Sequence, residues 1–119
     1  MLNNPVLKKA TEHFKDRISE TMEQYYCKTW DTTVYYKKVN SFKDEAKILN
    51  LHQSGKPTEA LVESLIVKCR NADGSKMFQP SDRVTLLNEV DPAVIIEIAA
   101  VINQGAEEYQ FDVDQTEKN

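Results

Sequence analysis

The chain has 119 residues, of which 40% are hydrophobic and 29% charged, a composition typical of one soluble globular domain. Its longest apolar run, Ala93 to Ile102, is too short and too charged for a membrane-spanning helix, and we also expect no secretory signal. The net charge of −4 lies within residues 106–119, whereas residues 1–105 are balanced, so we expect no nucleic-acid binding. We therefore expect a single domain over residues 1–105 and an acidic, flexible tail over 106–119.

The first predicted element is an amphipathic helix from Pro5 to about Gln24, with Asn4 as its cap. Its apolar residues recur every three or four positions, which places them on one helical stripe, and charged residues occupy the other faces. The stripe consists of Leu7, Ala10, Phe14, Ile18 and Met22. The pattern does not decide whether this stripe covers the protein's own core or another molecule.

Residues 25–39 are rich in aromatic and β-branched side chains, which favours β-strands. We predict a ribbon with one strand near 25–30 and another near 32–39. Five aromatic rings lie within twelve residues here, more than one face of a ribbon can bury. Core packing accounts for some of them, and the others are candidates for an exposed interaction face.

Two central helices follow the ribbon. Ser41, with Asp44 three residues later, predicts a helix start, and Gly55 ends this helix at about Ser54. We expect Phe42, Ala46 and Leu49 on its apolar face. Pro57 opens the next helix, which we expect to be central because Leu61, Leu65 and Cys69 form its apolar stripe and Val62 and Ile66 widen it.

The remaining elements are a turn and two helices. Residues 71–75, with Gly74 at a position that favours positive φ, predict the turn. A helix then begins at residues 80–82 with Val84, Leu86 and Leu87 inside. The last helix begins at Asp91-Pro92 and ends at Gly105; it is apolar on nearly every face, so its own domain or a neighbouring subunit must enclose it. The expected fold is mainly α (α+β), with about five helices and a short two-stranded β ribbon between the first and second.

No constellation of catalytic or metal-binding residues stands out. His13 and His52 are expected on the surface, and Cys27 and Cys69 as reduced thiols, with Cys69 buried. Asn71, Asp73 and Ser75 faintly resemble the start of a calcium loop, but its closing glutamate is missing, so a plain turn is favoured. We therefore predict no enzyme activity, no cofactor and no metal.

The order of these elements resembles the tail assembly chaperones of long-tailed (siphovirus-like) bacteriophages over residues 5–104. Its most specific parts are a Trp-x-x-x-Val-Tyr strand at Trp30, an Asp-Gly-x-x-x-Phe turn at Asp73, and an Asp-Pro-Ala-Val helix start at Asp91. None of these is a catalytic signature, so the resemblance depends on their order. It implies a mostly helical, self-associating protein without ATP, metal or active site.

The resemblance also implies a function. Such chaperones bind the tape measure protein, keep it soluble in the host cell cytoplasm until tail tube subunits assemble around it, and are absent from the mature virion. The expected partners are thus the tape measure protein, the tail tube protein and further copies of this chain. In many such phages a frameshift appends a further domain to this protein.

Exposed apolar and aromatic groups are the expected contacts with such a client. Side-chain chemistry, not the family motif, suggests two sets, one on the ribbon and one on the first helix: Trp30, Tyr35 and Tyr36, and Leu7, Phe14, Ile18 and Met22. The alternative function is a head–tail joining or minor tail structural protein, which would remain in the virion. A small regulator or enzyme is a third possibility, for which the sequence offers no motif.

Overall fold

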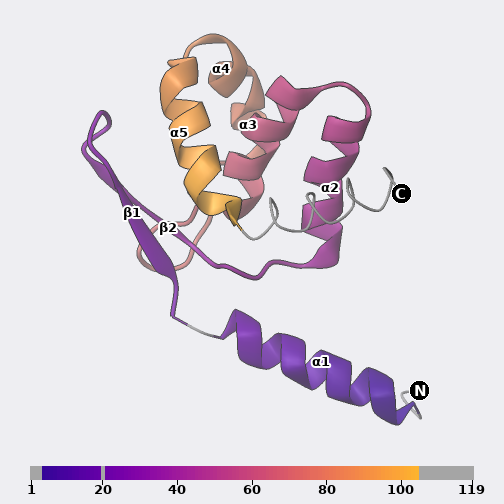
Figure 1. The fold of residues 1–119 in the computed structure, drawn as a ribbon. Helices are drawn as coiled ribbons and strands as arrows, with labels where there is room; N and C mark the ends of the chain where they lie inside the picture. Colours follow the sequence, from indigo (N-terminus) through magenta and orange to yellow (C-terminus); the bar gives the residue numbers. More distant parts are fainter. Residues whose placement is uncertain (1–3, 20, 105–119) are drawn as a thin grey trace.

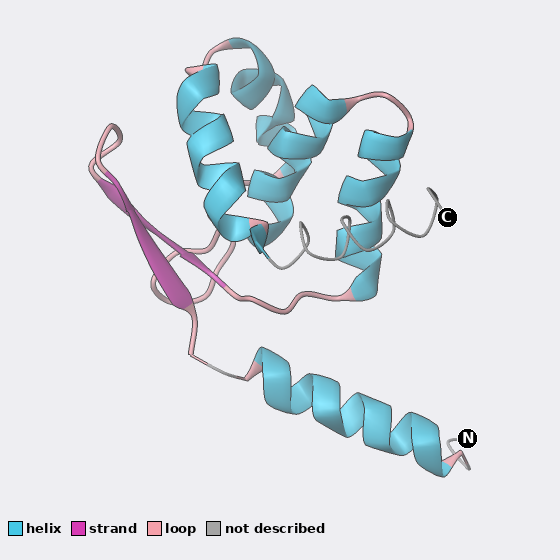
Figure 2. Ribbon diagram, in the orientation of Figure 1, coloured by secondary structure: helices cyan, strands magenta, loops and turns pink. Residues whose placement is uncertain are grey.

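The computed structural model describes residues 4–19 and 21–104, which form a helical body, a two-stranded sheet and a projecting N-terminal helix (Figures 1 and 2). The elements are α1 (Pro5–Ile18), β1 (Glu23–Cys27), β2 (Thr32–Tyr36), α2 (Phe42–Gln53), α3 (Pro57–Lys68), a 3₁₀ turn (Pro80–Asp82), α4 (Arg83–Asn88) and α5 (Pro92–Ile102). This arrangement confirms the mainly α fold with a ribbon between the first two helices. The expected tail over residues 106–119 and the helix end at Gly105 lie outside the described residues.

Helix α1 begins as predicted and ends early. The Asn4 side chain accepts hydrogen bonds from the backbone N–H groups of Val6 and Leu7, as an N-cap does. The helix ends at Ile18, and the N–H of Ser19 closes the last turn on the carbonyl of Lys15. The predicted extension to Gln24 is wrong, because residues 23–27 pair with β2 instead of continuing the helix.

Strands β1 and β2 are antiparallel and in a register that pairs Glu23 with Tyr36 and Cys27 with Thr32. Both strands are shorter than predicted, since residues 28–31 form the turn between them and Asp31 adopts a positive φ of 49°. Tyr35 also exchanges backbone hydrogen bonds of 3.1 and 2.7 Å with Arg70, which follows α3. The ribbon is thus tied to the helical body, as a two-stranded sheet requires.

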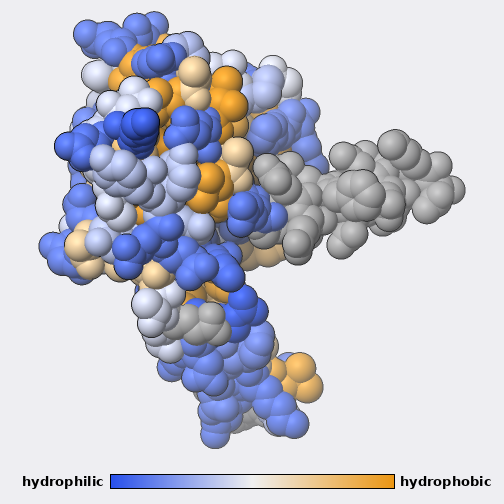
Figure 3. Space-filling view, turned by 60° about the vertical axis from the view of Figure 1, so that its left-hand side comes forward, coloured by the Kyte–Doolittle hydropathy of each residue, from blue (hydrophilic) through white to orange (hydrophobic). Residues whose placement is uncertain are grey.

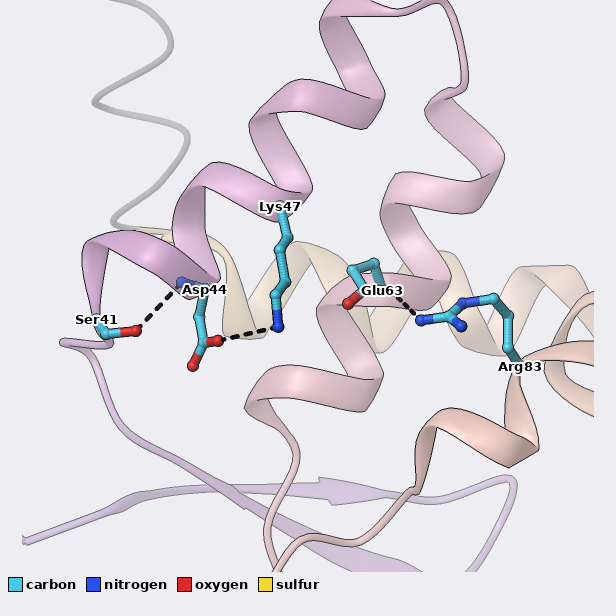
Figure 4. Close-up of polar contacts among 5 residues, drawn as sticks. All are labelled: Ser41, Asp44, Lys47, Glu63 and Arg83. Atoms are coloured by element: carbon cyan, nitrogen blue, oxygen red, sulfur yellow. Dashed lines mark hydrogen bonds and ion pairs between the residues drawn. The ribbon is translucent and has the colours of Figure 1, made fainter.

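Helices α2 and α3 form an antiparallel pair joined at Gly55, whose φ of +76° allows the turn. The Ser41 hydroxyl accepts a hydrogen bond of 3.2 Å from the N–H of Asp44, which confirms the predicted helix start (Figure 4). Phe42 is 76% exposed, so its expected place on the apolar face is wrong; Ile48 is the buried residue of α2. Phe42 is the first residue of α2, where little of its ring is covered.

Helix α3 is central, as predicted, and packs against α2, α4 and α5. Two ion pairs fix its neighbours. The Lys68 ammonium lies 2.9 Å from a carboxylate oxygen of Glu45 on α2, and the Arg83 guanidinium at the start of α4 bonds the Glu63 carboxylate (Figure 4). Because Lys68 is 2% exposed, the Glu45 carboxylate is the counter-ion of a buried ammonium group.

Helix α5 contributes five buried residues to the core: Val94, Ile95, Ile98, Ala99 and Ile102. Its first turn is capped by Asp91, whose carboxylate accepts a hydrogen bond of 2.9 Å from Ala93. The helix is not enclosed on all sides within one copy, because Ile96 is 54% exposed. In α4, Leu86 is buried, but Val84 is 67% exposed, and its predicted inward position is wrong because the short helix offers only one face to α3.

Candidate partner-binding surfaces

Helix α1 carries an uncovered apolar stripe. Among the described residues, α1 has no buried side chain, and Leu7 and Phe14 are 44% and 37% exposed. Ile18, at the end attached to the body, is half-buried. Val6, beside the stripe, is 72% exposed. An amphipathic helix gains most of its stability from covering its apolar face, so this stripe is a candidate contact surface.

Helix α1 is attached to the rest of the protein at its C-terminal end. The Lys37 ammonium donates a hydrogen bond of 2.5 Å to the carbonyl of Ile18, in the last turn of α1. This bond places a positive charge at the negative end of the helix dipole and anchors α1 where β2 ends. From this anchor α1 projects below the ribbon, while α4 and the start of α5 lie at the opposite end of the body (Figure 1).

Met22, the last member of the predicted stripe, is not part of it. It lies after α1 and immediately before β1, and it is half-buried. The structure therefore brings Leu7, Phe14 and Ile18 onto one helix face and leaves Met22 in the connection.

The ribbon aromatics separate into two groups. Tyr36 is 8% exposed and belongs to the core together with Val34, so its assignment as a contact residue is corrected. Trp30 lies in the turn, not on a strand, and its ring packs edge-to-face on Phe78 with centroids 6.4 Å apart. Tyr35 is half-buried on the opposite face of β2 from Val34 and Tyr36. Trp30 and Tyr35 thus keep part of their surface accessible.

Tyr26 is the exposed ring of the ribbon, at 53%. Its hydroxyl bonds the Asp31 carboxylate across the turn, which raises the pKa of Tyr26. Strand alternation could have identified it, because Tyr25 and Cys27 turn toward the core and Tyr26 between them must turn away.

Tyr25 joins the ribbon to α5. Its hydroxyl donates a hydrogen bond to the Glu97 carboxylate, and this bond, with a smaller effect of desolvation, raises the pKa of Tyr25 to about 12. Glu97 is the charged residue within the apolar run of α5, and it lies on the exposed side of that helix, where a carboxylate is tolerated.

A second apolar surface lies between α3, α4 and α5. It is a shallow groove with a volume of about 130 Å³. Its walls are nearly all apolar and include Leu61, Leu86, Leu87, Val90, Ile95 and Ile96. Apolar side chains gather on the helical body, and a further apolar group lies on the projecting α1 (Figure 3). Sequence periodicity did not reveal the groove, because its residues come from three separate helices.

The groups with the most reactive chemistry are enclosed. Cys27 and Cys69 are both fully buried, and burial raises the pKa of the Cys69 thiol to about 12. A thiol in that state is a poor nucleophile at neutral pH. Within residues 4–19 and 21–104, no cluster of His, Cys, Asp and Glu side chains could hold a metal ion.

None of the helices in the described part of the chain combines the length and apolarity needed to cross a membrane. Comparison of the chain with family models, with curated proteins and with solved structures finds no match.

Proposed function

We propose that this protein is a tail assembly chaperone of a long-tailed bacteriophage, which binds the tape measure protein and keeps it soluble in the host cell cytoplasm. The observation that carries the proposal is the uncovered apolar stripe of α1, on a helix without a buried side chain. A long helical client exposes similar stripes, and an amphipathic helix can cover one of them along its length.

The mechanism requires contact and no covalent chemistry. Covering apolar surface lowers its free energy by about 25 cal/mol per Å², so a few large side chains suffice for weak, reversible binding. Leu7 and Phe14 are the main candidate contacts, with Ile18 at the anchored end. Tyr26 and the accessible parts of Trp30 and Tyr35 form a secondary surface on the ribbon. The tail tube protein would take over the client as the tube assembles.

The proposal is tested by co-expression with the tape measure protein that the same phage would encode. We expect wild-type protein to raise the soluble yield of that client and to elute with it on gel filtration. Phe14→Glu places a charge in the stripe and should abolish both effects, whereas Lys9→Gln should not. Lys9 lies on the opposite face of α1, and both substitutions lower the net charge by one.

The alternative role as a head–tail joining or minor tail protein predicts a different location. Mass spectrometry of purified particles should find no stoichiometric copy of this chain. Its presence in the virion would favour the structural role, and an unchanged client yield without a complex would contradict the chaperone role.

A further inference from the structure

We infer that the groove between α3, α4 and α5 is a docking site for α1 of a second copy of this chain. The inference goes beyond the proposed function, because it concerns the protein without its client. It follows from two apolar surfaces that one copy leaves uncovered at opposite ends: the α1 stripe and the groove.

The groove has the size to accept one side chain of the stripe. The α5 residues that border it are Pro92, Ile95 and Ile96, which span about 6 Å at 1.5 Å per residue, about one turn of α1. The groove volume of about 130 Å³ is close to that of cavities of about 150 Å³ that hold a benzene ring. Phe14, in the middle of the stripe, provides such a ring.

The two surfaces also match in charge. Helix α1 carries a net charge of +2, and residues 83–97, which supply most of the groove wall, carry −2. The basic residues of α1 are Lys8, Lys9, Lys15 and Arg17, against Glu12 and Asp16. In 83–97, Arg83 stands against Glu89, Asp91 and Glu97. Opposite net charges at the edges of an apolar contact favour this pairing over a contact between two α1 helices.

The position of α1 favours a second copy over its own body. The bond from Lys37 to the Ile18 carbonyl holds the C-terminal end of α1 beside the end of β2. From there the helix points away from α4 and the start of α5 (Figure 1). Insertion into the groove of a second copy leaves this anchor intact, and reciprocal exchange between two copies would close a symmetric dimer.

Analytical ultracentrifugation of the purified full chain over a dilution series tests the inference. We expect wild-type protein to self-associate, and Phe14→Glu and Ile96→Glu each to raise the dissociation constant about tenfold or more. Both side chains are exposed, so the variants should fold, as circular dichroism will verify. Lys9→Gln, on the opposite face of α1, should change the constant by less than about threefold.

Disulfide trapping separates exchange between copies from closure within one copy. Phe14→Cys protein mixed with Ile96→Cys protein should oxidise to a mixed covalent dimer, and Lys9→Cys mixed with Ile96→Cys should not. The natural cysteines are fully buried and will not compete. The inference would be overturned if the wild-type protein is monomeric or if Phe14→Glu associates as the wild type does. It would also be overturned if a chain with both Phe14→Cys and Ile96→Cys forms the disulfide within a monomer. None of these results involves the client, so the proposed function would still stand.

Discussion

Replacing Glu45 by Gln should destabilise the protein through Lys68, which lies on a different helix. The Lys68 ammonium is 2.9 Å from the Glu45 carboxylate, and its side chain is 2% exposed, compared with 31% for Glu45. Gln keeps the size of the side chain and removes its charge, so the ammonium stays buried without a counter-ion. Breaking a fully buried pair costs about 3–5 kcal/mol; because the Glu45 side chain is 31% exposed, although the oxygen that faces Lys68 is buried, we expect about 1–3 kcal/mol here.

The free energy of unfolding is to be measured by urea titration at pH 7, with circular dichroism as the probe. Lys68→Met removes the buried charge and keeps an unbranched side chain, so Glu45→Gln should cost little in the Lys68→Met background. The matched control is Glu23→Gln, whose partner Lys38 is 3.4 Å away on the surface; it should change stability by less than about 0.5 kcal/mol. The reasoning fails if Glu45→Gln is equally harmless, or if Lys68→Met does not suppress its effect.

Four further substitutions, one of them a control, test the packing, the turn and the ribbon contact. Ile98→Ala, at a fully buried position of α5, should cost about 2–5 kcal/mol in urea titrations. Val84→Ala, at a position 67% exposed, should stay within about 0.5 kcal/mol, and similar losses at both sites would contradict the described core. Gly74→Ala should lower the free energy of unfolding by about 1 kcal/mol, because alanine is strained at the φ of +88° found there. Steric contact is not the cause, since no atom lies within 4 Å of the added Cβ. An unchanged urea midpoint would refute this. The hydrogen bond to Glu97 raises the pKa of Tyr25 to about 12. The contribution of this bond to the free energy of unfolding is therefore complete below pH 10 and disappears as the pH rises toward 12. With Tyr25→Phe, the free energy of unfolding should no longer fall between pH 10 and 12. The ultraviolet titration of the tyrosines should lose the step of highest pKa. A wild-type free energy of unfolding that does not change over that interval would count against the bond.

Local chemistry predicted where the helices begin. Asn4, Ser41 and Asp91 each accept a backbone hydrogen bond at the start of a helix, as their side chains and the residues after them indicated. These interactions involve residues two or three positions apart, so a sequence pattern contains all the information needed. The turn at Gly74 is of the same kind.

The pairing of residues far apart in the sequence determined where α1 ends and which ribbon side chains are buried, and local periodicity could not predict either. The helical period of the first stripe continues to Met22, yet α1 ends at Ile18 because Glu23 pairs with Tyr36, thirteen residues away. The same pairing turns Tyr36 into the core and leaves Tyr26 exposed, a choice that depends on the register of two strands. Amphipathicity therefore predicted the α1 stripe, but whether anything covers it is a property of the assembled fold.

The proposed function and the inferred exchange place two partners on one surface. If Phe14 packs either on a client helix or in the groove of a second copy, the two complexes exclude each other. Client binding and self-association must then each lower the affinity of the other by the same factor. In the free protein, the groove of the second copy covers the stripe and limits the exposure of apolar surface. A client that binds the stripe more tightly would displace the second copy. Adding client helix to the self-associated protein should therefore shift it toward smaller species in ultracentrifugation. A client complex that retains the full self-association of the free protein would show that separate surfaces serve the two partners.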